Sequence, residues 1–464
     1  MVAVPTGARG LVSGVGEADP RNIPRARPKR YMKQLLPPQQ KLADKFLKRH
    51  RSGLSTLDTS DMGTGKTVVA SWLAKESGRP VAVICPKSVI PSWERELKEM
   101  GVEPVFVLNY EKIRRGVKPF MSKVGKRIMK WSLNPETLIL MDEVHYAAGA
   151  YTQNAQLLIS LKQQGYTIHM MSGTASKSPT GMRAIGYALD LHSLNKPEGI
   201  LRNWYGWMRH YGCSQNNWNA WELKIRSKLK DLNSKMYDGE DACAGYLTIA
   251  DLPDAFKKNR LIVEPVSFDK NREIAKAYKE LNITPEILDK YILDGTVEDN
   301  EHVIVNMLRA RQLTEAYKVP FIVEQAVEAE SQGMSVAIFL NFRESVAAAC
   351  ELLENCPRIE GGQKDRQNAI DAFQQDKSHF IVVNSAAGGT GVNLHDLIGN
   401  RPRLSLITPS FDAEKYKQVL FRTYRNGAQT NTIQKVLVAA DTIEEHVVKL
   451  LNKKLEDLES LHRV

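Results

Sequence analysis

The sequence is poor in cysteine and has no long apolar run, and both absences exclude classes of protein. Its 464 residues include five cysteines, at positions 85, 213, 243, 350 and 356, whose spacing matches neither a disulfide framework nor a zinc site. No apolar stretch is long enough to span a bilayer, and the N-terminus has no signal-peptide core. We therefore expect a soluble intracellular protein of a reducing compartment, in a bacterial or host cytoplasm or in a eukaryotic nucleus.

Acidic residues are fewer than basic residues. Lysine and arginine number 64 against 53 aspartates and glutamates, which gives a formal net charge of +11. A surplus of this size favours a polyanionic partner, with nucleic acid first, over a basic protein that has no such partner. Part of the surplus lies in residues 21–30, where proline, arginine and lysine dominate without an apolar period. Residues 1–30 therefore read as a basic disordered arm.

A phosphate-binding loop is the strongest motif in the chain. Residues 60–67 read SDMGTGKT, with a serine where a first glycine is common. Gly63 and Gly65 let the backbone close around a triphosphate, and the N–H groups of the loop and of the following helix supply partial positive charge. We expect Lys66 to reach the β- and γ-phosphates of ATP and Thr67 to bind Mg²⁺ through its hydroxyl. A glycine-rich turn before a helix is the alternative.

An acidic element completes this predicted site. The apolar run 137–141 is typical of a buried parallel strand, and it ends in Asp142, Glu143 and His145. A carboxylate at the C-terminal end of such a strand faces the ligand crevice of an open α/β sheet. Asp142 is predicted to bind Mg²⁺, and Glu143 to orient or deprotonate the attacking water. A charged turn at a strand end is the alternative.

The order of apolar segments predicts two α/β domains. Strand-like runs alternate with helical stretches from about residue 35 to 190 and again after about 265, which indicates doubly wound parallel sheets. Between them lies a mainly helical segment with four of the seven tryptophans, at positions 204, 207, 218 and 221. Such a cluster either stacks on bases or packs a small subdomain, and packing is the favoured interpretation.

The motifs occur in the order found in superfamily 2 helicases. The segments 61–67, 83–90, 172–175, 386–394 and 418–429 most closely resemble those of SWI/SNF-type DNA translocases, in the compact annealing-helicase, fork-remodelling branch. The resemblance implies two tandem RecA-like lobes with a small helical subdomain between them. The expected domains are the arm at 1–30, a first ATP-binding lobe at 31–190, a tryptophan-rich helical insertion at 191–265, and a second lobe with a C-terminal helix at 266–464.

The resemblance also assigns roles to residues. The catalytic residues would be Lys66 and Glu143 with two arginine fingers, Arg422 and Arg425, whose spacing would put both on one face of a helix. ATP would be held by Gln39, which reads adenine, and by Met62, Gly63, Thr64, Gly65, Lys66 and Thr67. Coupling between the nucleotide and nucleic-acid sites is assigned to His145, Ser172, Thr174, Gly391, Asn393 and Gln418. Contacts to the nucleic-acid backbone are assigned to Pro86, Lys87, Trp93, Asn384 and Ser385.

The sequence departs from the family pattern at five positions. Thr64 replaces a leucine, Val144 an alanine, and Ala175 a proline. Tyr424 stands where a histidine is frequent, and Ala428 separates Gly427 from a glutamine that usually adjoins it. The last two changes flank Arg425 and bear on how that arginine is placed.

Together these features predict a monomeric ATP-dependent translocase that hydrolyses ATP with Mg²⁺ while it moves on duplex or branched DNA. Repair, recombination or replication-fork processing would be its setting. A strand-separating helicase for DNA or RNA is the first alternative, although no strand-splitting insertion is evident. A nucleic-acid-binding scaffold with a decayed ATP site is the second, and the intact motif residues argue against it.

Overall fold

The computed structural model describes residues 34–124, 128–173, 178–194, 203–217, 219–294, 301–354, 356–363, 365–388 and 392–460. The predicted arm at 1–30 lies outside the described residues, as do Thr174, Ala175, Trp218 and Gly391. No helix in the described ranges is long and apolar enough to cross a membrane.

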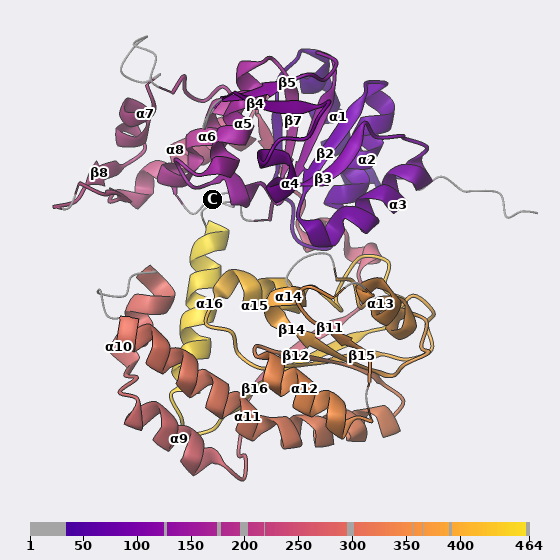
Figure 1. The fold of residues 1–464 in the computed structure, drawn as a ribbon, viewed down its shortest axis with the longest axis vertical. Coiled ribbons are helices and arrows are strands. Elements are labelled where there is room, and N and C mark those ends of the chain that lie inside the picture. The colour runs from indigo at the N-terminus through magenta and orange to yellow at the C-terminus, as the bar shows by residue number, and fades with distance from the viewer. Residues whose placement is uncertain are drawn as a thin grey trace, which may run out of the picture. The chain divides into compact units, whose positions relative to one another are not determined.

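The first lobe is built on a six-stranded sheet in the order β10-β1-β7-β6-β2-β3, and every pairing in it is parallel (Figure 1). Its strands are β1 Thr56–Asp58, β2 Val81–Cys85, β3 Phe106–Asn109, β6 Leu138–Asp142, β7 Thr167–Met171 and β10 Ala244–Gly245. The helices of this part are α1 Pro37–Arg51, α2 Lys66–Ser77, α3 Ile90–Met100, α4 Tyr110–Arg114, α5 Gln153–Gln163 and α6 Arg183–Ala188, and a hairpin pairs β4 Met121–Val124 with β5 Ile128–Trp131.

Alternate residues of the central strands pack into different cores. In β2, Ala82 and Ile84 belong to one apolar cluster, whereas Val81 and Val83 belong to another. A strand points successive side chains to opposite faces, so both faces of the sheet are covered. This is why the strand sequences are continuous apolar runs rather than alternating ones.

The tryptophan-rich segment packs against the first lobe. It contains α7 Trp204–His210, β8 Cys213–Gln215, β9 Trp221–Leu223 and α8 Leu229–Tyr237. Trp204 and Trp207 are both 2% exposed, stack with ring centroids 5.6 Å apart, and belong to the same core cluster as Ile84. Neither indole is available to stack on a base, which agrees with the packing interpretation. The chain then enters β10 and pairs with β1.

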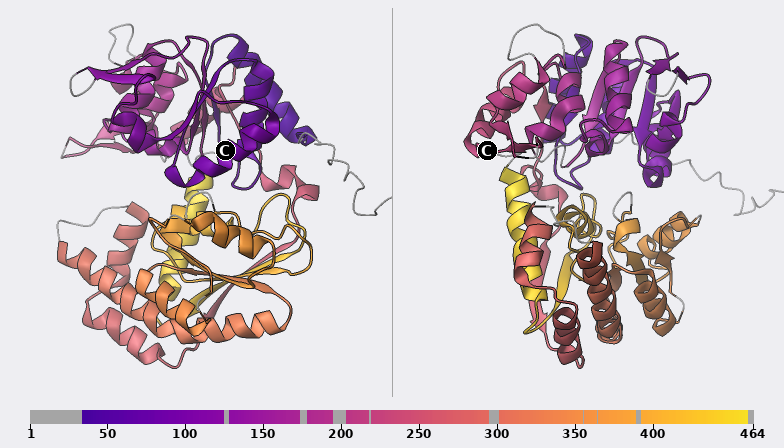
Figure 2. Two further views of the ribbon diagram at one scale, coloured as in Figure 1. Left: turned by 45° about the vertical axis from the view of Figure 1, so that its right-hand side comes forward. Right: turned by 60° about the vertical axis from the view of Figure 1, so that its left-hand side comes forward.

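The second lobe has its own six-stranded parallel sheet, in the order β11-β16-β15-β12-β14-β13. Helices cover both faces of this sheet (Figure 2, left). Its strands are β11 Asn259–Val266, β12 Ser335–Leu340, β13 Arg358–Ile359, β14 Phe380–Asn384, β15 Arg403–Ile407 and β16 Thr432–Ala439. Its helices are α9 Asn271–Glu280, α10 Pro285–Asp289, α11 Glu301–Ser331, α12 Arg343–Leu352, α13 Arg366–Gln374, α14 Ser385–Gly388, α15 Ala413–Leu420 and α16 Glu444–Ser460.

Two parallel sheets confirm the predicted fold class. The segment 191–265 contributes to both sheets, because β10 belongs to the first and β11 to the second. We therefore propose to place the boundary between the lobes after β10 and before β11, inside the segment that the sequence assigns to an insertion.

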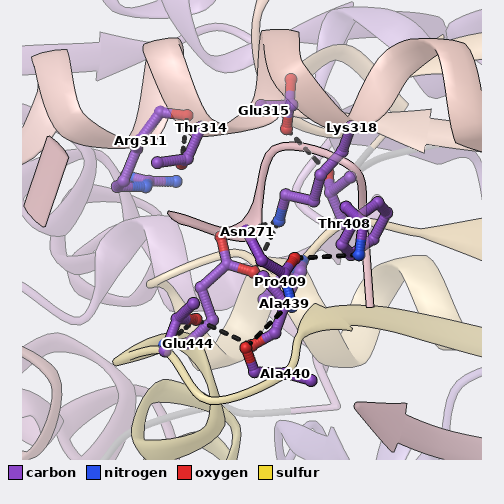
Figure 3. A network of polar contacts seen from close by, with 12 residues as sticks. Asn271, Arg311, Thr314, Glu315, Lys318, Thr408, Pro409, Ala439, Ala440 and Glu444 are labelled. Atoms are coloured by element: carbon purple, nitrogen blue, oxygen red, sulfur yellow. Dashed lines mark hydrogen bonds and ion pairs between the residues drawn. The ribbon is translucent and has the colours of Figure 1, made fainter. Parts of the chain in front are cut away.

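A buried ion pair fastens the C-terminal helix to the second lobe (Figure 3). Lys318 in α11 lies 2.6 Å from Glu444 in α16, and their side chains are 2% and 4% exposed. Glu444 also accepts a hydrogen bond of 3.0 Å from the N–H of Ala439 at the end of β16. One carboxylate therefore joins the longest helix, the last strand and the last helix.

Removing one member of this pair should destabilise the protein strongly. We expect Lys318→Met to lower the free energy of unfolding by about 3–5 kcal/mol, because it leaves the Glu444 carboxylate buried without its cation. Urea denaturation followed by circular dichroism would measure the loss. The matched control Lys276→Met disrupts an exposed 3.5 Å pair with Glu280 and should cost under about 1 kcal/mol. Equal losses in the two variants would contradict the role given to Lys318.

Candidate nucleotide-binding and catalytic site

The phosphate-binding loop lies between β1 and α2, where a parallel strand leads into a helix N-terminus. Gly63 and Gly65 have φ angles of +82° and +96°, a left-handed conformation that strains residues with a Cβ atom. Gly65 is the N-cap of α2, so its neighbours Lys66 and Thr67 form the first turn of that helix. The first backbone N–H groups of a helix have no partner within it and are suited to bind a phosphate.

Gln39 holds this loop from α1. Its side-chain Nε2 donates a 2.7 Å hydrogen bond to the carbonyl of Thr64, and its Oε1 accepts one of 2.9 Å from the N–H of Leu36. A Cβ at Gly65 would lie 2.6 Å from Nε2 of Gln39. Gly65 is thus required by the close approach of Gln39 as well as by its φ angle. The predicted adenine contact of Gln39 stays a prediction, while its contact with the loop is a feature that the motif did not indicate.

Lys66 points back into the loop. Its ammonium donates hydrogen bonds of 2.7 Å and 3.0 Å to the carbonyls of Ser60 and Asp61. Burial lowers the pKa of Lys66, and the nearby carboxylates, first that of Asp58, partly offset this effect. A cation that is desolvated and bonded only to neutral carbonyls gains from an incoming phosphate, which brings a full negative charge.

Ser60, the departure from the usual glycine, has a structural explanation. Its hydroxyl oxygen accepts a 2.9 Å hydrogen bond from the N–H of Leu247, and the carbonyl of Leu247 accepts one of 2.8 Å from the N–H of Asp61. The serine thereby ties the loop to the chain that follows β10.

The acidic pair lies at the end of β6, and the charges of Asp142 and Glu143 act on Lys66 of the loop. Oδ1 of Asp142 accepts a 2.9 Å hydrogen bond from the N–H of Glu143, and burial together with the charge of Glu143 raises the pKa of Asp142 to about 6. Glu143 has a φ of +52°, in the left-handed region that is uncommon for residues with a Cβ atom. Burial alone raises the pKa of Glu143, but the hydrogen bond from His145 and the charges of Lys66 and Arg422 outweigh it and lower the pKa. Glu143 is therefore ionised and suited to accept a proton from water.

His145 connects the catalytic carboxylate to the end of β7. Its Nδ1 lies 3.1 Å from Oε2 of Glu143 and 3.1 Å from the hydroxyl of Ser172. Ser172 follows β7, and its N–H donates to the carbonyl of Asp58. The structure therefore brings together two of the predicted coupling residues, His145 and Ser172, and links both to the acidic pair.

Asp58 is a site residue that the sequence reasoning missed. It is fully buried at the end of β1, and its Oδ1 accepts a 2.8 Å hydrogen bond from the N–H of Ser60. Burial raises the pKa of Asp58, and the charge of Lys66 opposes that shift. Asp58 is the last residue of β1, as Asp142 is of β6. A carboxylate at the end of a strand is therefore the sequence feature that indicates Asp58 as a site residue.

Arg422 and Arg425 lie in the turn after α15, and the prediction that they share a helical face is wrong. The helix ends at Leu420, and the carbonyl of Arg422 accepts a 2.8 Å hydrogen bond from the N–H of Leu394 instead of from a helical partner. The guanidinium of Arg422 donates to the carbonyl of Val392, and that of Arg425 donates to Oδ1 of Asn393. Burial, with the charge of Arg425, lowers the pKa of Arg422 to about 9.

The turn that carries the arginines contacts the phosphate-binding loop. The N–H of Asn426 donates a 3.4 Å hydrogen bond to the carbonyl of Gly63, and a Cβ at Gly63 would lie 3.5 Å from Cα of Arg425. The atypical Tyr424 packs on Phe256 with ring centroids 5.2 Å apart. The inserted Ala428 is buried, and its N–H closes the turn on the carbonyl of Arg425. Both departures from the motif thus stabilise the turn beside the loop.

Comparison with known proteins agrees with this arrangement. Residues 318–427 match the family model described as "Helicase conserved C-terminal domain". "Putative ATP-dependent RNA helicase L364" of Acanthamoeba polyphaga mimivirus is 28% identical over 446 residues, which cover 88% of this chain and 79% of that protein. "Chromatin remodeling factor mit1" of Schizosaccharomyces pombe is 28% identical over 95 residues, 20% of this chain and 6% of that protein.

The matches place a helicase C-terminal domain in the chain and show its similarity to SWI/SNF-type superfamily 2 helicases, which supports an ATP-hydrolysing enzyme that acts on nucleic acid. A solved structure, the Sulfolobus solfataricus SWI2/SNF2 ATPase core in complex with dsDNA, has 18% sequence identity, covers 94% of each chain and superposes with a TM-score of 0.36.

Residues around this helicase site fit a magnesium ion shared with ATP. Mg²⁺ prefers oxygen ligands and usually binds through one or two protein groups plus substrate phosphates. Thr67 and Asp142 offer a hydroxyl and a carboxylate from the two motifs that flank Lys66. Among the residues that the structure describes, no group of three or more His, Cys, Asp or Glu could hold a metal ion alone. The donor set therefore suits a cation that arrives with the nucleotide.

The residues predicted to contact nucleic acid differ in their exposure to solvent. Lys87 is exposed, whereas Pro86 is buried. The assignment of Trp93 to this group is wrong, because its side chain is 1% exposed and packs from α3 into a core cluster. Ser385 is 3% exposed, and Asn384 lines a cavity of about 470 Å³ together with Arg343.

Of the remaining coupling residues, Asn393 binds Arg425 as described above, and Gln418 is buried in α15. Thr174 and Gly391 lie outside the described residues. Their coupling roles stay predictions.

Truncating Gln39 should weaken ATP binding in this helicase. We expect Gln39→Ala to raise the KM for ATP by about tenfold, because the Thr64 carbonyl loses a buried hydrogen bond and the loop is less well ordered. The neighbouring Gln40→Ala is the matched control, since the Gln40 side chain bonds Asp44 on an exposed part of the same helix. Steady-state ATP hydrolysis would give both values, and an unchanged KM in the Gln39 variant would contradict this role.

Proposed function

We propose that the chain is a DNA translocase that hydrolyses ATP to move on duplex or branched DNA and remodel it. The observation that carries the proposal is the contact between the turn of Arg422 and Arg425 and the loop of Gly63. Residues from both lobes thus meet around one predicted phosphate site, as an ATPase whose turnover is coupled to movement requires.

Each group at the site has its own role in ATP hydrolysis. The N–H groups of the loop and the ammonium of Lys66 bind the β- and γ-phosphates of ATP. Glu143, ionised and steadied by His145, orients the attacking water and accepts its proton. Arg422 and Arg425 stabilise the negative charge that develops on the transferred phosphoryl group, a role for which a permanently charged planar donor is suited.

Mg²⁺ would be held by Thr67 and Asp142. When bound, it neutralises charge on the β- and γ-phosphate oxygens. Lys66 and the two arginines add to this charge stabilisation from their own positions around the phosphates.

Duplex DNA is the proposed track for two reasons. The motif order most resembles the SWI/SNF-type DNA translocases, and the net charge of +11 suits a polyanion whose backbone, rather than its bases, is contacted. The exposed Lys87 is the first candidate for a phosphate contact. We propose that one polypeptide suffices as the motor, because it contains both lobes.

A strand-separating RNA helicase is the second candidate. The observation in its favour is the printed name of the mimivirus relative, a "Putative ATP-dependent RNA helicase", which aligns with 88% of this chain. Unwinding of a tailed RNA duplex would support this candidate over the first.

The test is ATP hydrolysis measured without nucleic acid and with single-stranded DNA, duplex DNA, forked DNA and RNA. We expect strong stimulation by duplex or forked DNA. Glu143→Gln should lower the stimulated rate by at least about 100-fold, because it removes the proton acceptor. Glu136→Gln, an exposed position just before β6, is the matched control and should leave the rate unchanged.

Each other outcome selects a different function. Stimulation by RNA or single strands alone would favour the unwinding enzyme. Undiminished hydrolysis in the Glu143→Gln protein would contradict the catalytic assignment. No stimulation by any of the four nucleic acids would overturn the translocase.

A further inference from the structure

Trp93 makes a contact that the motif assignments do not explain. Its indole Nε1 donates a 2.9 Å hydrogen bond to Oδ2 of Asp142. The ring is 1% exposed and packs in a core cluster with Val83 of β2, Leu140 of β6 and Leu97 of its own helix α3. A rigid ring in such a setting has little freedom, so it fixes the position of the donor and, through it, of the carboxylate.

The remaining donors to Asp142 make its orientation depend on Trp93. Oδ1 accepts a 2.9 Å bond from the N–H of Glu143, and the backbone carbonyl of Asp142 accepts one of 2.7 Å from the hydroxyl of Tyr110. Each carboxylate oxygen can accept two hydrogen bonds or ligands, so one site on each stays open for a cation or a bound water. Without Trp93, Oδ2 has no protein donor in the described structure, and the carboxylate can rotate.

Trp93 is joined to the exposed Lys87 by a short helical stretch of the chain. Lys87 begins a short 3-10 turn, Lys87–Val89, whose end is closed by a 3.1 Å bond from the N–H of Val89 to the carbonyl of Pro86. Helix α3 begins at the next residue, and Trp93 lies in its first turns. A displacement of the turn by a bound phosphate therefore reaches Trp93 within one continuous helical segment.

We propose that Trp93 is a positioning residue that couples nucleic-acid contact at Lys87 to the orientation of the Asp142 carboxylate. The proposal rests on the proposed function, since it takes Lys87 as a nucleic-acid contact and Asp142 as a magnesium ligand. It assigns to Trp93 the control of ATP hydrolysis by nucleic acid, in place of the direct contact that the sequence suggested.

The first test replaces the indole by a ring without a donor. Trp93→Phe should raise the Mg²⁺ concentration that half-saturates binding of a fluorescent ATP analogue by about tenfold, the size expected when a residue that orients a metal ligand is lost. Trp131→Phe is the matched control, because Nε1 of the buried Trp131 donates a bond of the same length, 2.9 Å, to Ser160, away from the site. The control should bind as the wild type does.

Equal Mg²⁺ dependence in the wild type and the Trp93→Phe protein would overturn the proposal, as would an equal change in both tryptophan variants. Circular dichroism would establish that each variant is folded. If Trp93→Phe fails to fold, Tyr110→Phe, which removes the other aromatic donor to Asp142, should show a smaller shift in the same direction. No shift in that variant would count against the proposal.

The second test is a double-mutant cycle on the stimulation of ATP hydrolysis by duplex DNA. Lys87→Ala and Trp93→Phe should each reduce the stimulation ratio, and the double variant should be no worse than the more severe single one, because both act in one relay. Effects that multiply would overturn the coupling. If the wild-type protein is not stimulated by any nucleic acid, the proposed function fails instead, and the Mg²⁺ measurement still tests the positioning role.

Discussion

The ammonium of Lys66 is the group on which the rest of the site depends. It is desolvated at the start of α2, bonded to two carbonyls of its own loop, and surrounded by the carboxylates of Asp58, Asp142 and Glu143. Parallel strands deliver those carboxylates, since β1 and β6 both end at the same edge of one sheet. A partly buried cation among acidic groups depends on the register of the strand ends that carry those groups, so the apolar packing of the sheet sets the electrostatics of the site.

The second lobe also holds charged groups in place, but by hydrogen bonds rather than by strand ends. The turn of Arg422 and Arg425 is not helical, and it is held instead by hydrogen bonds to Val392, Asn393 and Leu394. These bonds place two guanidinium groups on one short turn without the help of a helix. Two arginines so close together repel each other, and the pKa of Arg422 is lowered to about 9 as a result of burial and that repulsion. Negative charge from ATP would offset both the burial of Arg422 and its repulsion with Arg425.

Much of this could be predicted from the sequence, for reasons that are local. The glycines of the phosphate-binding loop, the apolar run before Asp142 and the alternation of strands and helices are properties of short segments. The features that could not be predicted are contacts between segments that lie far apart in the sequence. That Gln39 holds the carbonyl of Thr64, that Trp93 bonds Asp142, and that Ser60 bonds Leu247 all join residues from different elements. The supposed helical face of the arginines failed because the carbonyl of Arg422 is taken by Leu394, far away in the sequence.

Trp93 also shows that two residues of one motif can face different parts of the protein. The sequence pattern predicts one contact surface for the segment that begins at Lys87, yet its tryptophan is buried and bonds Asp142 while its lysine is exposed. Burial of an aromatic ring is strongly favourable, and an indole that is buried needs an acceptor for its N–H. The carboxylate of Asp142 provides that acceptor.

Displacement of a triplex-forming oligonucleotide from duplex DNA tests the central claim most directly, because it reports movement along a duplex without requiring that the strands separate. We expect ATP-dependent displacement by the wild-type protein and none with an analogue that cannot be hydrolysed. ATP hydrolysis that is stimulated by duplex DNA but displaces no third strand would contradict translocation and leave a nucleic-acid-dependent ATPase without movement.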